Sequence, residues 1–155
     1  MIKKKNILLF TLLSALVLFQ HGTFQADSIK KLRVAAIDDL MEIKNIQDVQ
    51  IAPDGSQVLY VISGVDLEGN FYNSDIWLTG VKSSSSLKLT NGPKRDDTPR
   101  WSPDGKTIAF ISNRDGKNQI WLICPSGGEA WKLTDTENGV GPFFWSPDSR
   151  KIAFL

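Results

Sequence analysis

Residues 101–110 read WSPDGKTIAF, and residues 145–154 read WSPDSRKIAF. Upstream, residues 51–60 carry a third version, IAPDGSQVLY. In each copy a Pro-Asp pair follows a short apolar segment and precedes a run rich in β-branched and aromatic residues. That pattern is typical of a hairpin between two strands. The same hairpin pattern therefore occurs three times, and this repetition is the main evidence for the fold.

The copies follow a regular spacing. Trp101 and Trp145 are 44 residues apart, and so are Trp77 and Trp121. The same separation holds for further pairs, which are Ile76 and Ile120, Leu89 and Leu133, Thr90 and Thr134, and Pro103 and Pro147. A period of about 40–45 residues is the length of one four-stranded propeller blade. We therefore predict an all-β fold of β-propeller blades, each made of four antiparallel strands.

The second copy shows all the strands of one unit. The expected strands cover residues 99–102, 107–112, 119–124 and 130–134, with Gly- and Asn-containing turns between them. In the strand at 107–112, Ile108 and Phe110 point to one face while Ala109 and Ile111 point to the other. Both faces are apolar, so this sheet has to be covered on both sides, as a blade is by its neighbours.

The hairpin turn has a local explanation. Pro103 presets its own φ for the second position of a type I turn, and Asp104 suits the third position. Gly105 then supplies the left-handed conformation that lets the next strand return. In the third copy Ser149 replaces this glycine, which costs about 1–2 kcal/mol if the left-handed conformation is kept.

The repeated aspartates Asp54, Asp104 and Asp148 raise the question of a metal array. Each of them belongs to its own hairpin, and the surrounding sequence lacks the dense Asp and Gly spacing of a calcium loop. We therefore predict turn aspartates and no metal site.

The first copy is six residues longer than the second between its Pro-Asp pair and its Ile-Trp pair. The extra residues fall in 63–75, SGVDLEGNFYNSD, which has the composition of a loop. Phe71 and Tyr72 are candidates for touching a ligand or a neighbouring domain from this loop. The alternative, which we favour, is a longer surface turn with an aromatic side chain tucked back.

The N-terminal residues have the composition of a secretory signal peptide. Lys3, Lys4 and Lys5 precede a run of 13 mostly apolar residues at 7–19, and a polar stretch follows. The run is shorter than the roughly 20 residues of a membrane-spanning helix. We predict a signal peptide at 1–26 and export to the periplasm or the outside; an uncleaved N-terminal anchor is the alternative.

The rest of the chain divides into two parts. Residues 27–46 are expected to form a linker and one short helix, because Ile37, Leu40 and Met41 are spaced at i, i+3 and i+4 and Asp38 or Asp39 stands near the start. Residues 47–155 are expected to form a partial propeller of about two and a half blades. The expected limits are about 47–90 for the first blade, about 97–134 for the second and about 140–155 for the start of the third.

Composition excludes several function classes. Loss of Lys3, Lys4 and Lys5 with the leader leaves 15 basic and 17 acidic residues, a net charge near −2. No basic block survives to attract nucleic acid or an anionic membrane. The only cysteine, Cys124, allows no internal disulfide, and its apolar neighbours predict a buried strand residue.

Residues 27–155 also lack the parts of a hydrolase site. The only histidine, His21, lies in the predicted leader, and no G-x-S-x-G motif occurs. We therefore predict no catalytic, cofactor-binding or metal-binding residue in this chain, no cofactor, and no enzymatic activity of the chain by itself.

Several segments carry a family resemblance. They are DLMEIKNIQDVQIAPDGSQVLYVIS at 39–63, NSDIWL at 73–78, the run from 89 to 122 around WSPDGKTIAF, and GGEAWKLTD at 127–135. Over residues 36–155 the sequence resembles the propeller opening of exported bacterial prolyl oligopeptidase-family serine peptidases, closest to the acylaminoacyl-peptidase and dipeptidyl-peptidase branches. TolB-like propellers share the WSPDG and IAF elements.

The resemblance implies a substrate-gating propeller that caps a C-terminal α/β-hydrolase domain, where the serine, aspartate and histidine lie. The expected partners are that missing domain and short peptide substrates. Because propellers close with 4–8 blades, we expect this chain to be the N-terminal portion of a longer serine peptidase. Two alternatives remain open: a TolB-like, non-enzymatic periplasmic platform for protein interactions, and a stand-alone binding propeller.

Overall fold

The computed structural model describes residues 36, 39, 41–66 and 69–155, which belong to one compact unit. The predicted signal peptide lies outside the described residues. The predicted short helix lies largely outside them too, although Asp39 and Met41 have helical conformation. Within the described part of the chain, no helix is both long enough and apolar enough to span a membrane.

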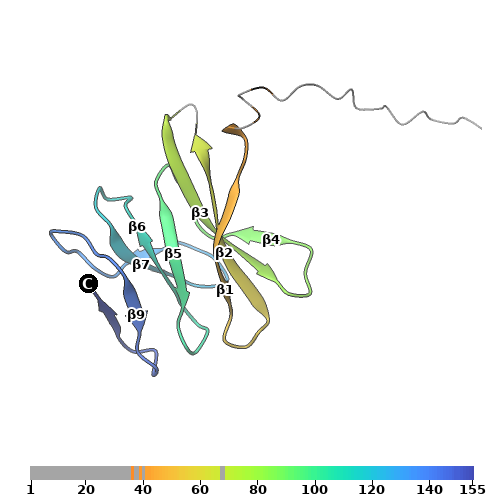
Figure 1. The fold of residues 1–155 in the computed structure, drawn as a ribbon. Coiled ribbons are helices and arrows are strands. Elements are labelled where there is room, and N and C mark those ends of the chain that lie inside the picture. Colours follow the sequence, from red (N-terminus) through yellow and green to blue (C-terminus); the bar gives the residue numbers. More distant parts are fainter. Residues whose placement is uncertain (1–35, 37–38, 40, 67–68) are drawn as a thin grey trace, which may run out of the picture. The chain divides into compact units, whose positions relative to one another are not determined.

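Three antiparallel sheets follow one another along the chain (Figure 1). The first contains β1 (Asn45–Ile51), β2 (Gln57–Asp66), β3 (Phe71–Gly80) and β4 (Ser86–Lys88). The second contains β5 (Asp96–Trp101), β6 (Ile108–Ser112), β7 (Gln119–Ile123) and β8 (Trp131–Lys132). The third contains β9 (Phe143–Trp145) and β10 (Ile152–Phe154). Strands within each sheet pair in sequence order, which confirms the predicted all-β class and the four-stranded antiparallel unit.

The repeated tryptophans occupy equivalent strands. Trp77 lies in β3 and Trp121 in β7, the third strand of each complete sheet. Trp101 and Trp145 are the last residues of β5 and β9, immediately before the Ser-Pro-Asp turns. The 44-residue register predicted from the sequence is therefore confirmed.

The three predicted hairpin turns are present. Gly55 and Gly105 both have a φ of +71°, and Ser149 has a φ of +61°. The backbone N–H of Gly105 donates to the Ser102 carbonyl at 2.8 Å, and that of Ser149 to the Ser146 carbonyl at 2.9 Å. Ser149 therefore keeps the left-handed conformation of the glycine that it replaces.

The aspartates of the turns accept hydrogen bonds from within the same turns. Oδ1 of Asp104 accepts a hydrogen bond from the Ser102 hydroxyl at 2.6 Å and another from the Lys106 backbone N–H at 3.1 Å. Because these donors favour the ionised carboxylate, they lower the pKa of Asp104. Asp148 has the same arrangement and a lowered pKa, with Ser146 and Arg150 as donors.

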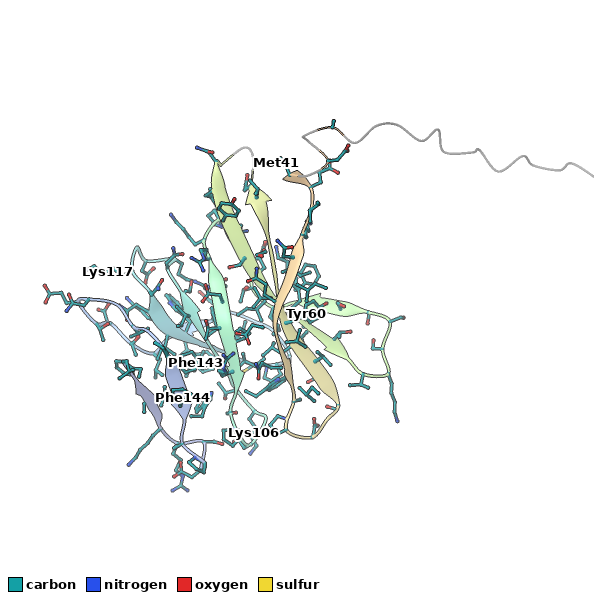
Figure 2. All side chains as sticks on the ribbon, in the orientation of Figure 1. Met41, Tyr60, Lys106, Lys117, Phe143 and Phe144 are labelled. Atoms are coloured by element: carbon teal, nitrogen blue, oxygen red, sulfur yellow. The ribbon has the colours of Figure 1, made fainter. Side chains whose placement is uncertain are left out.

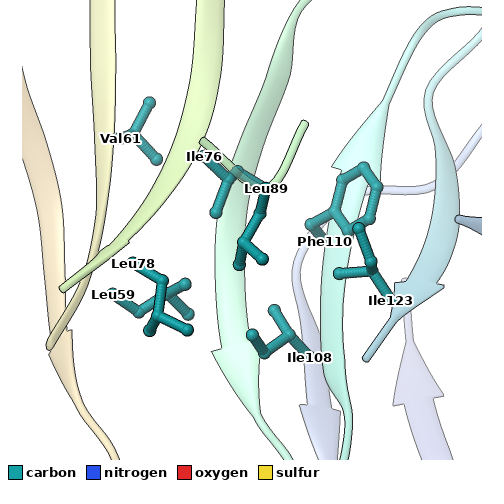
Figure 3. Close-up of a cluster of buried hydrophobic side chains, with 8 residues drawn as sticks. All are labelled: Leu59, Val61, Ile76, Leu78, Leu89, Ile108, Phe110 and Ile123. Carbon is teal, nitrogen blue, oxygen red and sulfur yellow. The ribbon is translucent and has the colours of Figure 1, made fainter. Parts of the chain in front are cut away.

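The main core lies between the first two sheets (Figure 3). β2 and β3 contribute Leu59, Val61, Ile76 and Leu78, and the second sheet contributes Ile108, Phe110 and Ile123; Leu89, after β4, completes the cluster. All of these side chains are buried. A second cluster joins the opposite face of β6 and β7 to the third sheet, through Ala109, Ile111, Ile120, Leu122, Val140 and Phe143. The second sheet is thus covered on both faces, as its two-sided apolar pattern predicts.

A charged pair reinforces the second sheet. Arg114, two residues after β6, donates from Nη2 to both carboxylate oxygens of Asp96 at 3.0 Å. Asp96 is 2% exposed. The Arg114 guanidinium also stacks over the Trp121 ring, 4.6 Å from its centroid, and lies 5.4 Å from that of Phe110. The pairing offsets the cost of burying the Asp96 carboxylate.

The predicted loop at 63–75 is wrong. β2 runs to Asp66 and β3 begins at Phe71, and these two residues pair with each other. The extra residues of the first copy therefore lengthen a hairpin. Tyr72 is also not tucked back, because 74% of its surface is exposed.

Ser149 offers a test of the third turn. Its hydroxyl oxygen accepts a hydrogen bond from the Asp104 backbone N–H at 3.0 Å, which links the second and third hairpins. We expect Ser149→Ala to lower the free energy of unfolding by about 0.5–1.5 kcal/mol, because it loses this bond and keeps the left-handed strain. Ser149→Gly also loses the bond but relieves the strain, so it should be about 1 kcal/mol more stable than the alanine variant. Urea denaturation measures both; an alanine variant at least as stable as the glycine variant would contradict this account.

Asp104 offers a pH test. Its pKa in the folded protein lies below the ordinary value of 3.8. The ionised carboxylate therefore contributes stability that is complete above about pH 4 and is lost as the pH falls through the lowered pKa. We expect Asp104→Asn to be less stable than the parent protein at pH 7 and to differ from it less at pH 3, as measured by urea unfolding. The same difference at both pH values would show that the charge does not stabilise the turn.

Candidate functional site

A polar cleft lies between the first two sheets. β1, β2, β3 and β5 surround a cavity of about 430 Å³, and β5 lies beside the first sheet (Figure 1). Six polar residues that line the cavity are Gln47, Asp48, Ser63, Ser74, Arg95 and Asp97. Cavities of a few hundred Å³ with a few convergent polar groups are the usual form of small-ligand sites. This cleft is therefore the candidate binding site.

An ion pair holds one side of the cleft. Nη1 of Arg100 in β5 donates to both carboxylate oxygens of Asp48 in β1 at 2.8 Å. Asp48 has a φ of +46° and lies at a register shift in the β1–β2 ladder, and Thr98 has a φ of +53° at the matching shift in β5. Irregularities of this kind re-aim side chains. The shift in β1 places the Asp48 carboxylate within reach of the second sheet.

A second pair lies on the other side. Nη2 of Arg95 donates to Asp97 Oδ2 at 2.8 Å. Arg95 also forms a parallel β-bridge with Ser74 of β3, so its backbone ties the segment before β5 to the first sheet. Arg95 in the lining and Arg100 beside it are therefore both already paired with carboxylates, so the charges at this point balance.

Unpartnered polar atoms line the cleft and its neighbourhood. The Ser74 hydroxyl and the Asn73 side-chain oxygen are both buried without a hydrogen-bond partner. Buried polar groups usually have partners, but these two atoms have almost no accessible surface, so they lie beside the cleft and do not open onto it. The Ser74 hydroxyl has no hydrogen-bond partner, so no base is in contact with it. The other polar groups that line the cleft can bind a polar ligand, but the described residues of its lining include no nucleophile in contact with a base.

The structure places one of the residues predicted from the sequence at the cleft, and it adds others that the sequence did not indicate. Tyr72 lines the cleft and is exposed, whereas Phe71 is half-buried and its ring lies against Gly69, so Phe71 is the aromatic side chain that is tucked back. The ion pairs of the cleft were missed, because Asp48 and Arg100 belong to no motif and lie 52 residues apart. Their only local signal is a charged residue in an otherwise strand-like segment.

The prediction of a buried Cys124 is wrong. β7 ends at Ile123, and Cys124 is an exposed free cysteine at the start of the following turn. The apolar neighbours are buried because they lie inside β7. In the described part of the chain, no group of three or more His, Cys, Asp or Glu residues is arranged to hold a metal ion.

Comparison with known proteins identifies the repeat. The PD40 family, described as the TolB beta propeller domain, matches residues 26–155. The uncharacterized peptidase YuxL of Bacillus subtilis is 48% identical over 87 residues, which make up 56% of this chain and 13% of YuxL.

Solved structures give the same picture. The acylaminoacyl peptidase of Pyrococcus horikoshii is 27% identical with a TM-score of 0.59, and the match covers 73% of this chain and 17% of that one. A putative TolB from Agrobacterium tumefaciens is 33% identical with a TM-score of 0.56, over 67% of this chain and 35% of that one.

The matched region is thus a small part of each of these longer proteins. The chain matches a propeller family, and similar regions occur both in proteins named as peptidases and in a putative TolB. The chain belongs to the TolB beta propeller domain family, and it is related to the propeller regions of peptidases.

Proposed function

We propose that this chain is the first part of a propeller that gates access to the catalytic domain of a serine peptidase. The observation that carries the proposal is the 48% identity to a protein named as a peptidase. The fold likeness to an acylaminoacyl peptidase, which extends over 73% of the chain, supports the same assignment. The substrates would be short peptides, because a propeller cap restricts entry to the site beneath it.

The chemistry of the cleft fits a gating role. It offers paired charges and buried hydrogen-bonding groups, but no activated nucleophile. Peptide hydrolysis through an acyl-enzyme therefore requires a separate α/β-hydrolase domain that supplies serine, histidine and aspartate. In this arrangement the propeller contributes shape and polar contacts, and the hydrolase domain contributes the reaction.

We further propose that the protein is exported to the periplasm or beyond. The support is the basic and apolar pattern of residues 1–26, which has the features of a cleavable signal peptide. A mature N-terminus near residue 27, found by N-terminal sequencing, is the expected result. A retained Met1 in the cytoplasmic fraction would contradict export.

A TolB-like interaction platform is the second candidate. The observation that favours it is the 33% identity to a putative TolB structure. The two candidates differ in what the full-length protein contains. A peptidase carries a G-x-S-x-G elbow followed by aspartate and histidine in an α/β-hydrolase domain, whereas a platform needs no such domain.

Activity of the full-length protein tests the proposal. We expect it to cleave short chromogenic peptides, with either free or blocked N-termini, and to lose this activity after treatment with a serine-directed phosphonylating inhibitor. Replacement of the elbow serine by alanine is the matched control, and it should abolish both cleavage and labelling. A full-length protein that neither cleaves these peptides nor takes up the label would favour the interaction platform.

A further inference from the structure

The β2–β3 hairpin extends past the end of the second sheet. The last pair of the β6–β7 ladder, Ser112 with Gln119, corresponds by the 44-residue spacing to Ile62 with Asp75. Beyond this point the β2–β3 ladder continues through four further pairs, which are Ser63–Ser74, Gly64–Asn73, Val65–Tyr72 and Asp66–Phe71. Figure 1 shows this part of the hairpin projecting beyond β6 and β7. We call these eight paired residues the hairpin extension.

An exposed aromatic side chain lies on the hairpin extension. Every second residue of a strand shares a face, so Tyr72 lies on the same face of the first sheet as Ile76, which is buried against the second sheet. The second sheet ends before it reaches Tyr72, and 74% of the Tyr72 surface is exposed within the described part of the chain. The ring is therefore held over the end of the second blade and is not packed into the core.

Two accessible charged groups share the polar cleft with this ring. Tyr72, Arg95 and Asp97 all line the cavity of about 430 Å³. The Arg95 side chain is 61% exposed, and among the described residues it makes one hydrogen bond, to Asp97 Oδ2 at 2.8 Å. A guanidinium carries about five N–H donors and a carboxylate accepts about four bonds, so both groups keep capacity for a ligand. An exposed ion pair contributes only about 0–1 kcal/mol, so a ligand can share it or open it at little cost.

These groups match the chemistry of a neutral peptide segment. Arg95 offers donors and Asp97 offers an acceptor side by side, and the C=O and N–H groups of a main chain need one of each. The charges of this pair balance, and the neighbouring Asp48 is already held by Arg100 at 2.8 Å. The described lining therefore favours neither an ammonium nor a carboxylate end of a peptide. The Tyr72 ring adds apolar surface for a side chain of the same segment, and it loses little conformational freedom on binding.

The path of the chain places Tyr72 at the end of the propeller where another domain is joined. β1 begins beside Ser63 of the hairpin extension, and the link from β4 to β5 crosses at the same end. Figure 2 shows Met41, before β1, at this end and Lys106, in the β5–β6 turn, at the opposite end. A further blade that repeats this path also finishes here, so a domain that follows the propeller is joined on the side of the hairpin extension. Tyr72 and the cleft thus lie on the side of the proposed hydrolase domain.

We propose that Tyr72 and the Arg95–Asp97 pair form a peptide-binding subsite, which holds an uncharged segment of the substrate while the hydrolase domain cleaves it. The Tyr72 ring covers a substrate side chain, Arg95 donates to a main-chain carbonyl, and Asp97 accepts from a main-chain N–H. The subsite thereby favours peptides that are long enough to reach the cleft from the cleavage site. This inference rests on the proposed function, because it takes the substrate to be a peptide.

Photocrosslinking in the full-length protein tests the subsite without any need for turnover. We expect Tyr72→p-benzoylphenylalanine to form a covalent adduct with the uncharged probe acetyl-Ala-Ala-Phe-Ala-amide, or with a fragment of it, as identified by mass spectrometry. Val81→p-benzoylphenylalanine is the matched control, because Val81 is 60% exposed and follows β3 at its opposite end; it should form no adduct. Crosslinks from position 72 only to another part of the protein or to a second copy, or no crosslink at all, would overturn the proposal.

Kinetics separates this inference from the proposed function. In a full-length protein that cleaves N-acetylated tripeptide p-nitroanilides, Tyr72→Ala should raise KM about fivefold or more with kcat nearly unchanged, because it removes a contact made equally before and during the reaction. Tyr72→Phe should keep most of the binding, and Val81→Ala should leave both constants at the parent values. An unchanged KM in Tyr72→Ala would overturn the subsite and leave the peptidase assignment intact. An inactive protein that still forms the adduct at position 72 would contradict the peptidase assignment and support the subsite.

Discussion

The structure depends on one constraint: a sheet that is apolar on both faces has to be covered on both. The second sheet meets this requirement within the described residues, because Phe110 and Ile108 face the first sheet while Ala109 and Ile120 face the third. The free energy of burial is thus shared between neighbouring sheets, and no sheet is stable by its own packing alone. The sequence repeats every 44 residues because every unit has to present the same two apolar faces to its neighbours.

Charged groups are placed where the sheets leave room for them. Arg114 uses its guanidinium both to pair with the buried Asp96 and to cover Trp121. Asp48 and Arg100 form a comparable link between β1 and β5. The Asp48–Arg100 pair joins the first sheet to the second, whereas the Arg114–Asp96 pair lies within the second sheet, and the apolar contacts supply most of the burial. Their exchange for unpaired groups would leave a charge with little access to water.

The sequence was sufficient for what is local and repeated. The Pro-Asp-Gly turns, the strand content and the equivalence of the tryptophans follow from short patterns, and the structure confirms each of them. Two local patterns misled. Cys124 follows an apolar strand but lies just beyond its end, and Gly64 and Asn73 resemble loop residues although they pair within a long hairpin. A hairpin can be lengthened by continued backbone hydrogen bonding, which side-chain composition predicts poorly. The cleft could not be predicted from the sequence, because Asp48 and Arg100 come together only in the folded chain.

Departures from the repeat carry the information that is specific to this protein. Where all blades agree, the residues serve turns and interfaces that any member of the family needs, and the function has to be sought elsewhere. Gly64 in place of arginine, Asp75 in place of Gln119 and Ser149 in place of glycine are such departures. Ser149 has a structural explanation, because its hydroxyl bonds the preceding turn. Gly64 and Asp75 occur together on one face of the first sheet, where Lys88 pairs with Asp75 at 2.8 Å and lies 6.0 Å from the centroid of the Trp77 ring. Lys88 thus does in the first sheet what Arg114 does in the second, because one cation both pairs with a buried carboxylate and covers a tryptophan. The two sheets therefore meet the same requirement with residues from different strands and turns.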